Sequence, residues 1–198
     1  EELQRALAGL NNSGENYKII DLFWKAKGVR CEFHNYVIYN AHRFSCVEED
    51  RNPLTSVDLG DRKYRVYQSV RFRSDSSHLD NLTIFIVHWS MRNSMKGDVE
   101  NRDKQDAARK LLSAIREGSG YKLVVGDFNQ EPYEEPFIVL KGSRSRKYVM
   151  DKDGLYNPFW SFLADGRGSI VAEDDEQFLC RVPLFDCALL SKEFLDPS

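Results

Sequence analysis

The sequence predicts one soluble domain of the α/β (α+β) class, in which helices flank a mixed β-sheet. Apolar segments of strand length at residues 81–89 and 121–125 stand on either side of an amphipathic helical pattern at residues 101–118. A strand, a helix and a second strand in this order are typical of a crossover connection. With 198 residues, 41% of them apolar and 30% charged, the chain has the size and composition of one domain, which we expect to span residues 1–198.

The first part of the chain contains one helical pattern and then several strand patterns. Apolar residues recur at helical spacing between residues 2 and 10, and Asn-Asn-Ser-Gly at residues 11–14 ends this pattern. Residues 36–39, 42–47 and 64–72 are rich in residues that favour strands, and the last of these segments alternates polar with apolar side chains. These three segments predict strands of an antiparallel or mixed sheet.

The second part of the chain contains the most apolar segments. Residues 81–89 are almost continuously apolar and β-branched, as expected of a central strand covered on both faces. The helix at residues 101–118 carries its apolar side chains on one stripe, and a buried strand at 121–125 follows it at once. Residues 133–168 predict long surface loops with short local structure, and residues 184–190 predict another buried strand.

Composition excludes several classes of protein. The net charge of −3 is not that of a protein that holds nucleic acid by electrostatics alone, so a phosphate-bearing ligand must be met by a local patch or a metal. No apolar run approaches the roughly 18 residues of a membrane span, so we expect no membrane association. The four cysteines form no CxxC pair, and Cys187 lies in an apolar run, which favours a reducing, cytoplasmic location.

The segment Gly126-Asp127-Phe128-Asn129 carries the clearest chemistry. It follows a buried strand, and Gly126 allows the backbone to turn closely. Residues two apart on a strand point to the same side, so we expect Asp127 and Asn129 to form a polar pair that can hold a hydrated Mg²⁺ or a water. The alternative is a turn in which both side chains merely cap the loop backbone.

This motif, together with the order of other residues, resembles the endonuclease/exonuclease/phosphatase superfamily. A buried strand ends at His88, a helix carries Arg102 and Gln105, and a later apolar strand carries Asp186. The resemblance covers the chain from about residue 80 onward. It implies a two-layered β-sandwich flanked by helices and hydrolysis of phosphate esters with a divalent metal ion, Mg²⁺ or Mn²⁺.

The resemblance also implies roles for individual residues. His88 works near the leaving-group oxygen, and histidine is the side chain that changes charge near neutral pH. Asp127 and Asn129 serve catalysis and metal binding, and Asp186 borders the phosphate site. An acid within an apolar strand is costly unless it is paired, although Asp186 at a strand end facing solvent remains an alternative. Arg102 either contacts the phosphate or pairs with a nearby acid, and we favour the acid.

Some landmarks of the superfamily are absent from this sequence. The superfamily begins with a strand carrying an Asn and a second strand ending in a metal-binding Glu, and it ends with a Ser-Asp-His motif. We expect both ends of the superfamily domain to lie outside these 198 residues, and an isolated chain of this length to be inactive. A weaker alternative assigns Glu1 or Glu2 as the metal ligand.

Nucleic acid is the substrate that the sequence favours. Basic residues and one aromatic residue gather between residues 141 and 148, and we assign Arg144, Arg146 and Lys147 to substrate binding. The alternative is a loop that is simply solvated, as charged loops often are. The alternatives are a phosphatase or phosphodiesterase of another phosphate ester, of the phosphoinositide or sphingomyelin type, or a non-catalytic binding module on the same fold.

Overall fold

The computed structural model describes residues 2–12, 14–25, 32–33, 35–59, 63–74, 81–90, 97–169 and 183–196. The helices in these residues are α1 (Glu2–Asn11), α2 (Gly97–Arg116), α3 (Glu135–Val139), α4 (Arg146–Lys152), α5 (Trp160–Ala164) and the 3-10 helix η3 (Lys192–Phe194). The strands are β1 (Tyr17–Asp21), β2 (Trp24–Lys25), β3 (Glu32–Phe33), β4 (Tyr36–Asn40), β5 (Phe44–Asp58), β6 (Lys63–Ser74), β7 (Leu82–His88), β8 (Tyr121–Asp127), β9 (Gly142–Ser143), β10 (Leu155–Tyr156) and β11 (Asp186–Leu190).

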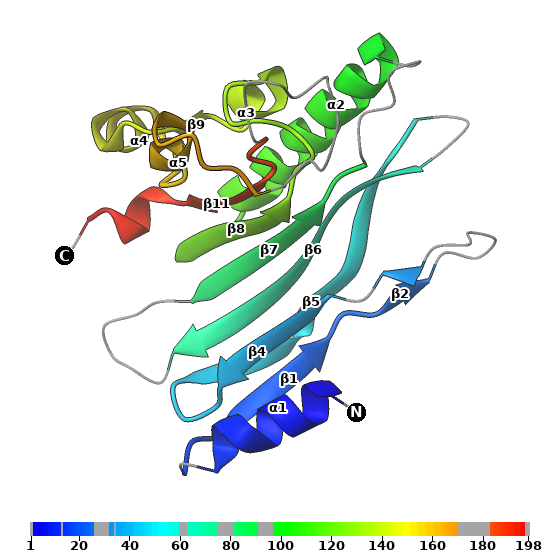
Figure 1. Cartoon of the computed structure of the whole chain (residues 1–198), viewed down its shortest axis with the longest axis vertical. Coiled ribbons are helices and arrows are strands. Elements are labelled where there is room, and N and C mark those ends of the chain that lie inside the picture. Colours follow the sequence, from blue (N-terminus) through cyan, green and yellow to red (C-terminus); the bar gives the residue numbers. More distant parts are fainter. Residues whose placement is uncertain are drawn as a thin grey trace.

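Most of these strands form one mixed sheet. Within the described residues the sheet has seven strands in the order β5-β6-β7-β8-β11-β10-β9. Strands β5, β6 and β7 pair antiparallel, β7 and β8 pair parallel, and β11 returns antiparallel to β8. Figure 1 shows helices α2 to α5 on one side of this sheet and the β1 and β4 strands, with α1, on the other.

The crossover predicted from the sequence connects β7 to β8 through α2. Residues Ala107, Ala108 and Leu111 of α2 are completely buried, and Ile115 continues the same stripe. They pack against Phe85, Val87 and Val124 of the sheet, among others, in the larger hydrophobic core. Because this core lies between α2 and the sheet, it fixes the positions at which β7 and β8 end.

A second, smaller core joins the sheet to the β1/β4 ribbon, the antiparallel pair formed by Tyr17–Asp21 and Tyr36–Asn40. Its buried members come from the end of β1 and from β6: Ile20, Leu22, Val70 and Phe72. The ribbon is therefore a second β-layer, and the predicted architecture of two β-layers flanked by helices is confirmed. In the described part of the chain this second layer is much narrower than the first.

The predicted elements are present with shifted ends. Helix α2 begins at Gly97 rather than residue 101, and β11 begins at Asp186 rather than residue 184. The loop region at 133–168 contains α3, α4 and α5 and two strands of two residues each. Strand β1 was not predicted. Within the described residues, no helix combines the length and the apolar composition needed to cross a membrane.

Candidate functional site

Three polar residues stand side by side at one end of the sheet. His88, the last residue of β7, is the register partner of Asp127, the last residue of β8. Asp127 is in turn the register partner of Asp186, the first residue of β11. Register partners on neighbouring strands point to the same face, so the sequence-predicted residues His88, Asp127 and Asp186 form one row.

The row is accessible to a ligand. The His88 Nε2 atom lies 4.0 Å from the Asp127 Oδ2 atom, and the two side chains are 49% and 30% exposed, respectively. Asp186 is also exposed, at the start of its strand rather than in its middle. Asp186 therefore lies at a strand end facing solvent, which was the alternative considered from the sequence. This position still places its carboxylate next to Asp127.

Asn129 fastens the Asp127 carboxylate from the buried side. The Asn129 backbone N–H donates to Asp127 Oδ1 at 2.7 Å, and its Nδ2 donates to Asp127 Oδ2 at 3.0 Å. The same Nδ2 donates to the backbone carbonyl of Trp89 at 2.8 Å. Asn129 lies beyond the strand with a φ of 46°, a left-handed conformation that asparagine tolerates better than most residues. It reaches Asp127 through a tight turn, not through strand alternation.

Buried groups hold this turn in place. Lys104 of α2 is 1% exposed, and its Nζ donates to the Asn129 backbone carbonyl at 2.9 Å. Gln130 Nε2 donates to the same carbonyl at 2.8 Å. Trp89 is fully buried, its indole N–H donates to the Val66 carbonyl, and its ring packs edge-to-face on Phe128. The residues that follow β7 and β8 are therefore anchored in the core.

The described residues do not complete a metal site. They contain no group of three or more His, Cys, Asp and Glu side chains placed to hold a metal ion. Both oxygens of Asp127 accept hydrogen bonds from Asn129. The Asn129 Oδ1 atom is buried and has no hydrogen-bond partner in the described structure. This oxygen could therefore accept a hydrogen bond or bind a cation. Metal binding by Asp127 and Asn129 remains a prediction.

The basic residues assigned to substrate binding lie elsewhere. Strand β10 pairs with β11 through Tyr156 and Leu190, and Leu190 pairs with Leu123, four residues before Asp127 on β8. This offset is about 13 Å along the strand. Arg146 donates to the backbone carbonyl of Leu195, beyond the carboxyl end of β11.

Arg144, Arg146 and Lys147 are thus exposed near the end of β11 opposite to Asp186, and the structure does not bring them to the row. Arg144 lies over the Trp160 ring, with 6.0 Å between its Cζ atom and the ring centre. Arg102 is exposed on α2, and the side chains of the acids proposed to pair with it are not described. Of the residues proposed as an N-terminal metal ligand, Glu2 is exposed on α1 and Glu1 lies outside the described residues.

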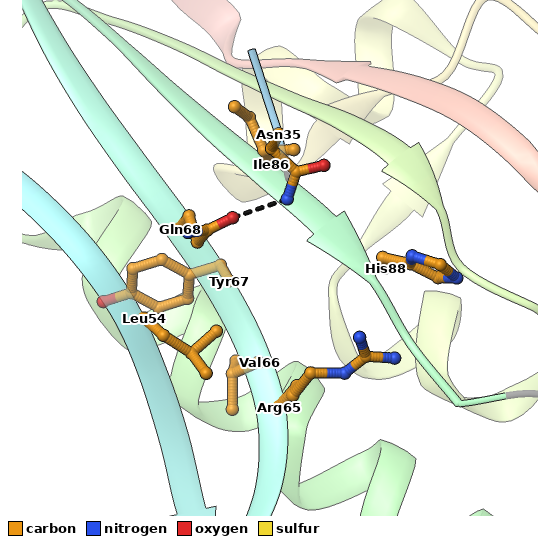
Figure 2. Close-up of a pocket in the computed structure, with 8 residues that line it drawn as sticks. All are labelled: Asn35, Leu54, Arg65, Val66, Tyr67, Gln68, Ile86 and His88. Atoms are coloured by element: carbon orange, nitrogen blue, oxygen red, sulfur yellow. Dashed lines mark hydrogen bonds between the residues drawn. The ribbon is translucent and has the colours of Figure 1, made fainter. Parts of the chain in front are cut away.

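Sequence reasoning missed a cation beside His88. Arg65 of β6 lines an open depression together with His88 and Gln68. Figure 2 shows the Arg65 guanidinium group and the His88 ring at the same end of this depression. The sequence signal for Arg65 was its place between apolar Tyr64 and Val66, in a strand that neighbours the strand of His88. It was obscured because β6 carries several other charged residues.

No protein-family model and no curated protein matches the sequence. The fold of several solved structures does match. The catalytic domain of human Nocturnin with bound sulfate matches with a TM-score of 0.55 at 18% identity, over 96% of this chain and 64% of that one. An endonuclease/exonuclease/phosphatase from Bacteroides vulgatus matches with a TM-score of 0.56 at 11% identity, over 96% and 68% of the two chains.

Truncated TDP2 from Caenorhabditis elegans matches with a TM-score of 0.54 at 15% identity, over 94% of this chain and 66% of that one. The present chain therefore spans 64% to 68% of the length of these three structures. The low identities limit the comparison to the fold. The chain has the fold of the endonuclease/exonuclease/phosphatase superfamily.

Proposed function

We propose that the protein is a phosphoesterase that hydrolyses nucleic-acid phosphodiesters with a divalent metal ion, Mg²⁺ or Mn²⁺. The observation that carries this proposal is the row of His88, Asp127 and Asp186 with Asn129 behind it. The fold supports it, since one neighbour is an endonuclease/exonuclease/phosphatase and another was solved with a sulfate, a tetrahedral anion like phosphate.

The residues of the row suit an in-line attack of water on phosphorus. Asp127 accepts a proton from the water as the new P–O bond forms, because its carboxylate is partly exposed and is fixed by Asn129. The bond from phosphorus to the leaving oxygen breaks, and His88 in its protonated form donates a proton to that oxygen. His88 and Asp127 are close enough to act on one phosphate group.

A divalent metal would add positive charge at the phosphoryl oxygens, where charge builds up during the reaction. Since the described residues do not complete a site for it, no step above depends on the metal. The described oxygen ligands nearest to this role are Asp127, Asn129 Oδ1 and Asp186. The proposed metal requirement rests on the resemblance to the superfamily.

Nucleic acid is the proposed substrate because a polymer can reach both parts of the surface. The basic residues near α4 lie too far along the sheet to touch a phosphate held at Asp127, but a chain of several nucleotides would span the distance. Arg144, Arg146 and Lys147 would then bind backbone phosphates remote from the cleaved bond. A small phosphate ester would not reach them.

The direct test is hydrolysis by the full-length protein. Short single-stranded RNA and DNA, a soluble phosphoinositide and sphingomyelin are offered with Mg²⁺, with Mn²⁺ and with EDTA. We expect cleavage of a nucleic acid that requires the metal, and a loss of at least about 10²-fold in rate for His88→Ala and for Asp127→Ala. Undiminished activity in EDTA contradicts the metal requirement. Cleavage of only the lipid-type esters reassigns the substrate, and binding without any cleavage favours a binding module.

The basic residues have a separate test. Replacing Lys141, Arg144, Arg146 and Lys147 together by Ala should weaken the binding of a nucleic acid and flatten the salt dependence of its affinity. The reason is that binding through fewer phosphate contacts releases fewer counterions from the nucleic acid. Cleavage of a dinucleotide should stay unchanged, since it does not reach α4. An unchanged affinity and salt slope removes these residues from the proposed interface.

We also propose a cytoplasmic location. Cys187 and Cys46 both have free thiols; Cys187 is buried and Cys46 is half-buried. Free thiols suit a reducing compartment. Imaging of the tagged full-length protein inside cells would test this location. Export of the protein into the medium would contradict it.

A further inference from the structure

A depression on the sheet opens directly beside the His88 end of the row. It is shallow, because the centre of a water molecule can occupy only about 20 Å³ of it, and its total empty space of about 300 Å³ includes open solvent. Its lining comes from the segment before β4 and from β5, β6 and β7: Asn35, Leu54, Arg65, Val66, Tyr67, Gln68, Ile86 and His88. The catalytic roles proposed above use only His88 from this set. Of the others, Leu54, Arg65 and Ile86 are partly exposed, so a substrate can contact them.

One end of the depression is cationic. Arg65 lies on β6, the strand that pairs with β7, and it lines the depression together with His88. Figure 2 shows both basic side chains at this end. A phosphate group beside Asp127 and Asp186 meets two carboxylates, so it needs positive charge nearby. The cluster at α4 is at the far end of β11, whereas Arg65, among the described arginines, lines the same depression as His88.

The rest of the depression is apolar with an amide rim. Leu54 and Ile86 are partly exposed and supply aliphatic walls, while Val66 and Tyr67 lie buried beneath. Tyr67 is held by an edge-to-face contact with Phe85, and its ring centre lies 5.1 Å from that of Phe85. Aliphatic walls with a few polar groups suit a flat heterocycle better than a sugar, whose hydroxyl groups would be buried without partners.

The amide rim is rigid. Gln68 is 2% exposed, its Nε2 donates to the Leu22 carbonyl at 2.6 Å, and its Oε1 accepts from Asn35 Nδ2 (Figure 2). The Asn35 backbone carbonyl also accepts from Leu22 N–H at 2.9 Å. These bonds tie the β1/β4 ribbon to β6 and fix one wall of the depression. A preformed wall lowers the entropic cost of binding a rigid ligand.

We propose that this depression binds a nucleoside monophosphate unit of the substrate, with Arg65 on a phosphate oxygen beside His88 and the base against Leu54 and Ile86. The guanidinium group provides paired donors that match phosphate oxygens. This inference rests on the proposed function, because it identifies the part of a nucleic acid that occupies the site next to the cleaved bond.

Binding tests the inference without any turnover. Adenosine 5′-monophosphate, ribose 5-phosphate and inorganic phosphate are titrated into the protein, and affinity is measured by calorimetry and by the ¹H–¹⁵N and methyl spectra. We expect the nucleotide to bind at least about tenfold more tightly than ribose 5-phosphate, since the base buries apolar surface. We expect Arg65→Gln to weaken both by about 10- to 100-fold, the scale of one hydrogen bond to a charged group.

Matched variants separate the two halves of the inference. Arg73→Gln changes an exposed arginine on the same strand and should leave all affinities unchanged. Leu54→Asn should weaken the nucleotide but not inorganic phosphate. Arg65→Lys retains the charge, and it replaces Arg65→Gln in the titrations if Arg65→Gln disturbs the spectrum of the folded protein.

The outcomes have distinct meanings. No binding of any probe, or an unchanged phosphate affinity in Arg65→Gln and Arg65→Lys, overturns the inference. Equal affinities for nucleotide and ribose 5-phosphate overturn the assignment of the base. If binding follows the expectation but the full-length protein cleaves no phosphate ester, the proposed function fails while the nucleotide site stands.

Discussion

Adding a methyl group at Gly126 should separate the strands that carry His88 and Asp127. Gly126 has a φ of 134° and lies across from Val87 in the parallel pairing of β7 and β8. A Cβ atom at this position would overlap the Val87 carbonyl oxygen and lie 3.0 Å from its carbonyl carbon. Both are backbone atoms of a buried strand, so no side-chain rotation relieves the clash. Either the strands move apart or the turn changes.

The cost follows from two effects. A side chain in this backbone region costs about 1–3 kcal/mol, and overpacking in a buried place costs about 1–3 kcal/mol more. We therefore expect Gly126→Ala to lower the free energy of unfolding by about 2–6 kcal/mol, a large part of the roughly 5–15 kcal/mol of a typical domain. The separation should also lengthen the distance between His88 and Asp127.

Two other glycines give controls in the same denaturant titration. Gly120 has a φ of 87°, and a Cβ there would overlap the Asn81 carbonyl oxygen at the other end of the β7/β8 pair. Gly120→Ala should therefore destabilise to a similar extent while leaving the ¹H–¹⁵N signals of His88 and Asp127 in place. Gly9 of α1 has open space, so Gly9→Ala should stabilise by about 0.5–1 kcal/mol. A Gly126→Ala protein within about 1 kcal/mol of the wild type, with unchanged His88 signals, would refute the reasoning.

Three further predictions follow from individual contacts. Asn129→Ala should lower the free energy of unfolding by about 1–3 kcal/mol, because the Asp127 and Trp89 oxygens lose a donor, and Asn129→Gly should cost less because φ is 46°; urea titrations compare the two. Burial raises the pKa of the Cys187 thiol to about 12, so iodoacetamide at pH 8 should leave Cys187 unmodified until the protein unfolds, as peptide mass spectrometry would show; rapid native labelling would contradict its burial. The hydrogen bond from Lys192 holds the pKa of Asp153 below its usual value, so Lys192→Met should lower the free energy of unfolding by under about 1 kcal/mol at pH 7 for this exposed pair. The difference in stability between variant and wild type should vanish as the pH falls through the lowered pKa of Asp153. A difference that grows in acid would contradict this prediction.

The fold was predictable where burial is continuous. Strands β7 and β8 and helix α2 were located within a few residues, because an apolar strand and an apolar helical stripe leave few alternative arrangements. Strand β1 was missed because only Ile20 of its five residues is buried, and its pairing with β4 across intervening residues is a long-range contact. Local pattern carries little information about such a strand.

The site was predictable only in part, for a similar reason. His88 and Asp127 were found because each follows an apolar strand, and Asp186 because it is an acid within an apolar segment; the register then places the three residues in one row. The position of Asn129 was not given by its spacing, since the strand ends at Asp127 and the chain turns with a left-handed residue. The remoteness of Arg146 and the proximity of Arg65 depend on sheet order and register, which the local sequence does not encode.

The most direct test of the proposed site is the rate of phosphodiester hydrolysis by the full-length protein with Asp127→Asn, compared with Asp153→Asn. Both changes remove one carboxylate charge, but Asp127 lies in the row with His88 and Asp186, whereas Asp153 caps the end of α4. We expect Asp127→Asn to reduce the rate by at least about 10²-fold and Asp153→Asn to leave it within about twofold. Equal rates for the two variants, in proteins with unchanged spectra, would contradict a catalytic role for this row.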